Sequence, residues 1–108
     1  MKRYVRSDTV PANSYAKQIA KKTFGTWYNE QDRVKIYKQS AGYAVKYYAE
    51  TPAEADKVLA DMIETAEYFD IPVLKSFTKL GFLYGSVHCY VACVVVPAVE
   101  SADQINFC

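Results

Sequence analysis

The chain has 108 residues, of which 51% are apolar and 23% charged, and its formal net charge is +1. This length and balance predict a single globular domain, residues 1–108, and argue against a disordered chain. The sequence starts without an apolar leader segment, and the longest apolar run, residues 87–97, is about half as long as a membrane helix. Three cysteines form no disulfide framework. We therefore expect a cytoplasmic protein that does not enter a membrane.

The two halves of the chain carry opposite charge. Residues 1–48 contain ten Lys and Arg against three acids, whereas residues 49–108 contain three Lys against nine acids. A compact fold can bring both halves to one surface, so this asymmetry in sequence does not by itself separate charge in space. Ten tyrosines are a second anomaly, and Tyr suits half-buried sheet faces and binding surfaces equally well.

In chain order, a weak strand at residues 2–6 precedes a basic helix. Pro11, which follows Asp8 and Thr9, marks the start of this helix, and Gly25 marks its end. An apolar stripe runs along it at Ala12, Ala16, Ile19, Ala20 and Thr23. The helix dipole favours cations toward the C-terminal end, where the sequence places Lys17, Lys21 and Lys22.

Residues 33–39 and 43–48 both alternate between polar and apolar, and the turn-like residues 40–42 separate them. This pattern predicts a β-hairpin. If the apolar members face the core, the opposite side is exposed, basic and aromatic. That outward set is Arg33, Lys35, Tyr37, Lys46 and Tyr48.

Thr51, Pro52 and Glu54 form the strongest local signal, a helix start with a capping residue, a first-turn proline and a third-position glutamate. The apolar stripe of this second helix runs to about Tyr68 through Ala55, Val58, Leu59, Met62, Ala66 and Phe69. Acidic residues occupy its other side, which is typical of a solvated face and is also an alternative binding surface. These acids are Glu54, Asp61, Glu64 and Glu67.

Two further strands complete the expected fold. Residues 73–80 fit a strand, although their apolar spacing also fits a short helix, and residues 87–96 predict a strand buried on both faces. Residues 98–108 have weak periodicity and predict a surface tail. The sum is an α+β, two-layer domain: a largely antiparallel sheet of four or five strands with two helices on one face.

Residues 42–48 and 50–59 resemble the third strand and second helix of an RNA-recognition motif, whose RNP1 element opens with Gly, an aromatic and a small residue. The chain departs from that pattern at Ala41, Val45 and Lys46. A Lys buried against two helices would need a partner, so we expect Lys46 to point away from the helices, opposite to the family. The resemblance implies a ferredoxin-like βαββαβ order with an added C-terminal strand.

His88, Cys89 and Cys93 invite a metal interpretation, which strand geometry opposes. Residues four apart in a strand are about 13 Å apart, and adjacent residues point to opposite faces. We expect Cys89 and Cys93 to be buried structural residues and Cys108 to be exposed, with no metal site. One histidine in an apolar strand and the absence of catalytic motifs predict no enzyme and no cofactor.

Two binding hypotheses follow. The first is a small non-catalytic module that binds nucleic acid or a nucleoprotein through the outward basic and aromatic set, with Lys17 and Lys21 adding charge. The second is a protein-binding adaptor or inhibitor of the phage or mobile-element type, acting on a nucleic-acid-processing complex such as a CRISPR effector. It would use the acidic helix or a Tyr-rich surface, and the same helix could join two copies by complementary charge.

Overall fold

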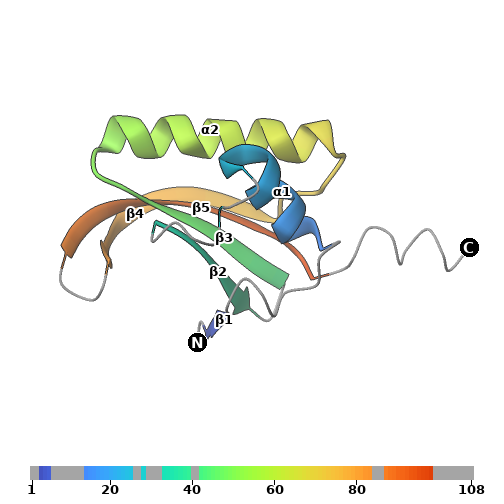
Figure 1. The fold of residues 1–108 in the computed structure, drawn as a ribbon, viewed down its shortest axis with the longest axis horizontal. Coiled ribbons are helices and arrows are strands. Elements are labelled where there is room, and N and C mark those ends of the chain that lie inside the picture. The colour runs from blue at the N-terminus through green and yellow to red at the C-terminus, as the bar shows by residue number, and fades with distance from the viewer. Residues whose placement is uncertain are drawn as a thin grey trace, which may run out of the picture.

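The computed structural model describes residues 3–5, 14–25, 28, 33–39, 42–83 and 87–98. Both helices lie on the same face of one sheet, so the predicted α+β two-layer architecture is confirmed (Figure 1). The elements are β1 (Arg3–Val5), α1 (Tyr15–Phe24), β2 (Val34–Gln39), β3 (Gly42–Ala49), α2 (Pro52–Tyr68), β4 (Lys75–Leu83) and β5 (Val87–Pro97). No helix in these ranges is long and apolar enough to span a membrane.

The five strands form a single sheet in the order β1-β2-β3-β5-β4, and every neighbouring pair is antiparallel. The predicted hairpin is β2 and β3, and the weak strand near the N-terminus is β1. The contested segment is a strand, as predicted, because β4 pairs with β5 along its whole length. β5 lies inside the sheet between β3 and β4 and is buried on both faces from Val91 to Val96. Of the predicted tail, only Ala98 lies among the described residues.

The ferredoxin-like arrangement is only half present. In a split β-α-β unit, two parallel strands joined by a helix lie on either side of another strand. The unit β3-α2-β4 has this form, because β5 is antiparallel to both and lies between them. β1 and β2, which are joined through α1, are instead antiparallel neighbours at one edge. The predicted order of elements, βαββαβ with an added C-terminal strand, is therefore present along the chain, but the N-terminal unit lacks the ferredoxin-like sheet arrangement.

The basic helix α1 begins later than predicted. Ser14 is its N-cap, with an extended backbone and a side-chain oxygen that accepts a hydrogen bond from the Lys17 N–H at 3.3 Å. A serine cap satisfies one of the open N–H groups of the first turn, so the helix starts at Tyr15 and not near Pro11. The helix ends at Gly25, as predicted, and this glycine has a φ of +98°.

Thr51 caps α2 as predicted, but Glu54 reaches back to the N–H of Glu50, the residue before the cap, and not to the Thr51 N–H of a capping box. The Thr51 side chain accepts a hydrogen bond from the Glu54 N–H at 3.1 Å, and a carboxylate oxygen of Glu54 accepts one from the Glu50 N–H at 2.9 Å. The other carboxylate oxygen of Glu54 accepts a bond from the Tyr47 hydroxyl at 3.0 Å. These bonds fix the entry angle of α2 over the sheet.

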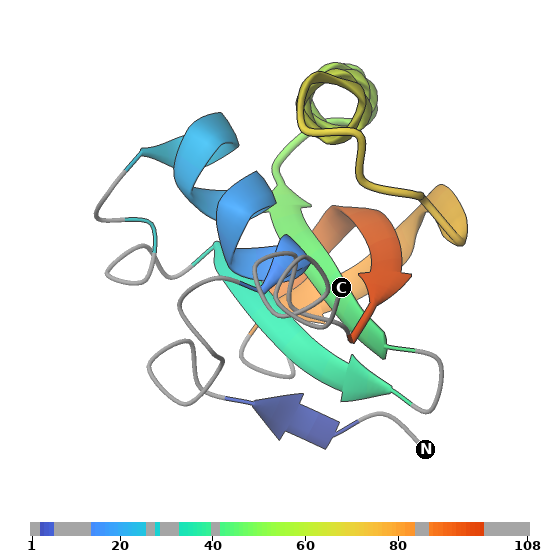
Figure 2. The ribbon, with the colours of Figure 1, turned by 90° about the vertical axis from the view of Figure 1, so that its right-hand side faces the viewer.

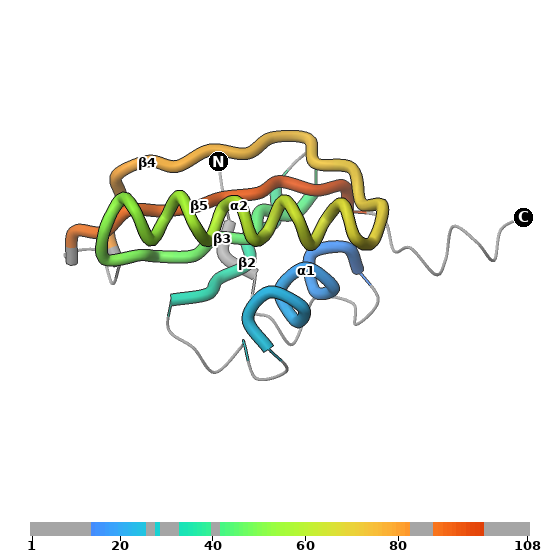
Figure 3. Tube along the Cα trace, turned by 90° about the horizontal axis from the view of Figure 1, so that it is seen from above, coloured from blue at the N-terminus to red at the C-terminus, as the bar shows by residue number. Residues whose placement is uncertain are grey.

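The main core lies between the helices and the sheet. Its largest fully buried side chains come from both layers: Ile19 of α1, Met62 of α2, Ile36 of β2, Val45 of β3, and Val94 and Val96 of β5. Figures 2 and 3 show α2 running along β5 while α1 lies beside it over the β2–β3 side. Thr23 of α1 donates a hydrogen bond to the Thr65 hydroxyl of α2 at 3.0 Å, so the two helices also contact each other.

Gly42 is required where β3 meets β5. Its φ is +155°, and a Cβ at this position would lie 1.9 Å from the carbonyl oxygen of Val96. A backbone atom cannot move away as a flexible side chain could, so any larger residue would separate the two strands. The glycine that resembles the start of an RNP1 element therefore has a packing role in this fold.

Candidate functional site

The face of the sheet that carries neither helix, here called the open face, is built by alternate residues of β2 to β5. Residues next to one another in a strand point to opposite faces, so the neighbours of the helix-side core residues define it. Its members are Lys35 and Tyr37 on β2; Ala44, Lys46 and Tyr48 on β3; Lys75, Phe77 and Lys79 on β4; and Cys89, Val91, Cys93 and Val95 on β5.

Strand register places these residues in rows across the sheet. Lys35 lies opposite Lys46, Lys46 opposite Cys93, and Cys93 opposite Phe77. Cys89 and Cys93 are buried on this face, as expected, and His88 is exposed. The centre of the open face is therefore small and apolar, and longer polar side chains stand around it.

Lys46 and Tyr48 point away from the helices, as predicted, but the expectation that they are exposed is wrong. Each retains only 6% of its accessible surface. Tyr48 packs with Cys89 and Val91, and the ammonium of Lys46 lies 4.8 Å from the centre of the Tyr37 ring. Small neighbours on β5 leave space beside these long side chains, which fold down onto the sheet and do not extend into solvent.

Tyr37 and Tyr48 share a hydrogen bond between their hydroxyl oxygens, which are 3.0 Å apart. Burial raises the pKa of Tyr48 well above its ordinary value, and the bond from Tyr37 raises it further. Tyr48 therefore stays neutral at physiological pH. The pair joins β2 to β3 across the open face and holds Tyr37, which is half-buried, in position.

Arg33 has a role inside the protein. One guanidinium nitrogen donates to the backbone carbonyl of Tyr48 at 2.7 Å, and another donates to the Glu50 carboxylate at 2.9 Å. The arginine thus connects the start of β2 with the end of β3. Its charge is partly compensated by Glu50, which weakens it as a contact for an external anion.

Sequence reasoning missed the contribution of β4 to this face. Lys75 and Lys79 are exposed, and their ammonium groups lie 5.6 and 5.7 Å from the centre of the Phe77 ring. Such distances are typical of cation–π contacts. The alternating residues 75, 77 and 79 carried the signal, but it could be interpreted only once the segment was known to be a strand and its register was known.

The other predicted binding residues lie on the opposite side of the sheet. Lys17 and Lys21 belong to α1, so the fold does not bring them together with the open face. Of the acidic set on α2, Glu54 accepts hydrogen bonds from the Glu50 N–H and the Tyr47 hydroxyl, and Asp61 pairs with Lys57 at 3.0 Å. Glu64 and Glu67 are exposed. Positive charge on the open face and negative charge on α2 are therefore separated by the thickness of the domain.

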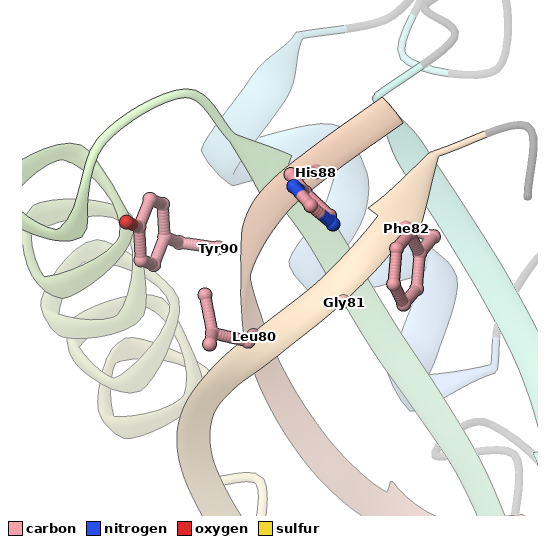
Figure 4. Close-up of a pocket in the computed structure, with 5 residues that line it drawn as sticks. All are labelled: Leu80, Gly81, Phe82, His88 and Tyr90. Carbon is pink, nitrogen blue, oxygen red and sulfur yellow. The ribbon is translucent and has the colours of Figure 1, made fainter. Parts of the chain in front are cut away.

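A shallow apolar pocket lies where β4 ends and β5 begins. Leu80, Gly81 and Phe82 of β4 line it together with His88 and Tyr90 of β5 (Figure 4). Leu80 is 71% and Phe82 57% exposed, which is high for such residues. Within the described ranges, no group of three or more His, Cys, Asp or Glu side chains is placed to hold a metal ion.

Comparison with known proteins gives no match: no protein family, no curated protein and no solved structure. The resemblance of residues 42–59 to an RNA-recognition motif therefore has no support beyond those residues. The structure also differs from that motif at the residue level, because Tyr43 packs on the helix side while Lys46 points to the open face.

Proposed function

We propose that the protein is a small non-catalytic module that binds nucleic acid, or a nucleoprotein, through its open face. One observation carries the proposal: on this face the only charged residues that β2 to β5 contribute are lysines, and they stand beside aromatic rings. These residues are Lys35, Lys46, Lys75 and Lys79 with Tyr37, Tyr48 and Phe77. Modules that bind single-stranded nucleic acid combine such charge with aromatic side chains on which bases stack.

The contact surface differs from the one expected from sequence. Lys75 and Lys79 are the accessible cations, and Phe77 lies between them. The Cα atoms of residues four apart in a strand are about 13 Å apart, so a base stacked on Phe77 would have an ammonium group on either side for its phosphates. Lys46 and Tyr48 support this surface from below and do not touch the ligand.

Fluorescence anisotropy with labelled single-stranded DNA and RNA, and with a duplex of each, tests the proposal. The affinity should fall steeply with added salt because binding to phosphates releases counterions. The double variant Lys75→Ala/Lys79→Ala should bind at least about tenfold more weakly. Its salt slope on a single strand should be lower by about 0.7 for each phosphate that the variant no longer neutralises.

The matched control is Lys17→Ala/Lys21→Ala, which removes the same charge from the opposite side of the domain. It should bind as the wild type does. Phe77→Leu should weaken binding to single strands about five- to tenfold with an unchanged salt slope, because stacking is removed while the charges remain. No salt-sensitive binding to any of the four probes, or equal weakening in both lysine variants, would overturn the proposal.

A second candidate is a protein-binding surface on α2. Glu64 and Glu67 are exposed, and the helix ends at Tyr68. The Tyr68 ring meets the ring of the next residue, Phe69, edge to face with centres 5.0 Å apart. Tyr68 is 70% exposed. Acidic and aromatic side chains together suit a basic partner surface. Glu64→Lys/Glu67→Lys would abolish capture of such a partner while leaving nucleic-acid binding intact.

A further inference from the structure

β4 is a long strand at the edge of the sheet. It has nine residues, and among the described strands it pairs only with β5. β1, at the opposite edge, has three residues. An edge strand presents unpaired N–H and C=O groups to any extended chain that approaches it. Apolar side chains accompany this edge, since Leu74, Leu80 and Phe82 are 52%, 71% and 57% exposed.

The order of side chains along β4 is complementary to itself. If two copies of the strand pair antiparallel about a two-fold axis at Thr78, the helix side matches Ser76 with Leu80, and Thr78 with its own copy. The open-face side of the same register matches Phe77 with Lys79 and Lys75 with Gly81. Thr–Thr pairs and cation–π pairs directly across two strands both stabilise a sheet.

The nearest alternative registers are worse. An axis at Phe77 sets Lys75 directly opposite Lys79, and an axis at Lys79 sets Lys79 opposite its own copy. Like charges directly opposite each other destabilise a strand pair. An axis at Leu80 avoids this conflict but loses the Thr78 self-pair and the match of Phe77 with Lys79. Of these registers, the axis at Thr78 is the one that keeps both pairs without setting like charges opposite each other.

We propose that a second copy of this chain pairs with β4 in the Thr78-centred register, which joins two sheets into one. The two-fold axis is perpendicular to the sheet, so both pairs of helices lie on one side and both open faces on the other. Phe77, Lys75 and Lys79 of the two copies then meet at the centre of a continuous basic surface. This interface is independent of the proposed nucleic-acid binding, although it would double the available surface.

The effect of salt distinguishes self-association through β4 from nucleic-acid binding. The two Lys79 residues lie on a diagonal in this register, about 7–8 Å apart across the strand pair. Added salt screens their repulsion and strengthens apolar association, so self-association should increase with salt. Nucleic-acid binding should decrease under the same change.

Cysteine cross-linking of the full chain tests the register in the absence of nucleic acid. In a Cys108→Ser background, Thr78→Cys places two thiols directly opposite each other, and mild oxidation should convert most of the protein to a disulfide-linked dimer. Ser76→Cys alone is the matched control and should stay unlinked, because its own copy is four positions away. Ser76→Cys combined with Leu80→Cys should restore the link.

Sedimentation velocity without cross-linking supplies the second measurement. The wild type should show a concentration-dependent dimer, and Leu80→Glu/Phe82→Glu should raise its dissociation constant at least about tenfold by placing charge in the helix-side row. Tyr68→Glu changes an equally exposed residue away from β4 and should leave the dissociation constant of the dimer unchanged. A chain that is monomeric at every concentration overturns the proposal. So does a dimer that survives Leu80→Glu/Phe82→Glu, or one that Thr78→Cys does not link.

Discussion

The two faces of the sheet bury side chains in different ways. On the helix side, burial comes from a second layer, so large apolar residues such as Ile36 and Val45 are closed in by α1 and α2. On the open face neither helix contributes, and yet Lys46 and Tyr48 each retain only 6% of their accessible surface. Tyr48 is covered by lateral packing with Cys89 and Val91, and Lys46 lies opposite the small Cys93 in strand register. Low exposure alone therefore does not distinguish a core residue from a surface residue that is folded down.

The largest expected effect is on the helix side. Met62→Ala opens a cavity between α2 and the sheet, which two packed layers cannot easily close, and should lower the free energy of unfolding by about 2–5 kcal/mol. Urea denaturation measures this free energy of unfolding. Glu64→Ala, on the exposed side of the same helix, should change the value by less than about 0.5 kcal/mol. Equal losses would show that α2 is not anchored by its buried stripe.

Adjacent residues of β5 compare the two faces directly. Val94 faces the helices and Val95 faces the open side, and both are nearly fully buried. Val94→Ala should cost about 2 kcal/mol, whereas Val95→Ala should cost about 1 kcal/mol because Phe77 and Tyr37 can move into the space. Thermal or urea unfolding of the two variants gives the ratio. An equal cost would mean that the open face is as rigidly packed as the main core.

The tyrosine pair of the open face gives the next effect. Tyr48→Phe leaves the Tyr37 hydroxyl without that partner and should cost about 1–2 kcal/mol. The pKa of Tyr48 is raised above 10.0, the ordinary value that it has in the unfolded chain. The contribution of Tyr48 to stability is therefore present below pH 10.0 and is lost as pH rises above that value, because the unfolded chain ionises first. Between neutral and alkaline pH, the free energy of unfolding should therefore fall less steeply for Tyr48→Phe than for the wild type.

A cap variant perturbs the helix layer without touching either face. Thr51→Ala removes the acceptor for the Glu54 N–H and should cost about 1 kcal/mol. Thr51→Ser is the matched control and should retain most of the stability, because its hydroxyl reaches the same N–H. Circular dichroism during denaturation follows both variants. If Thr51→Ala has no effect, tertiary packing alone determines where α2 begins.

The smallest effect concerns the Glu54 carboxylate at the same helix start. The hydrogen bond from the Glu50 N–H, followed by that from the Tyr47 hydroxyl, lowers the pKa of Glu54 below its ordinary value of 4.5. Its contribution to stability is therefore present above that value and is lost as pH falls below it. At neutral pH, the free energy of unfolding of the wild type should exceed that of Glu54→Gln. This difference should be smaller than the loss that Thr51→Ala causes. The gap should shrink toward pH 3, and a constant gap would contradict this cause.

Local signals predicted the elements well. Thr51, Pro52 and Glu54 located the start of α2, and strict alternation around Val34 and Val45 located the β2–β3 hairpin. Each signal acts over a few residues through hydrogen bonds or side-chain direction, so no distant part of the chain had to be known. The start of α1 was misplaced because Pro11 indicated an earlier beginning, whereas the folded backbone shows that Ser14 is the cap.

The two-layer class, the identity of most strands and the side of β3 to which Lys46 points could be predicted from the sequence, because these follow from periodicity and from the cost of burying charge under helices. Beyond the β2–β3 hairpin, strand pairing became known only from the folded domain. Pairing depends on contacts between residues far apart in the chain, which local pattern does not encode. It placed β5 between β3 and β4 and brought Lys75, Phe77 and Lys79 onto the face of the first hairpin. It also folded Lys46 and Tyr48 onto small β5 residues and left β4 as the long open edge.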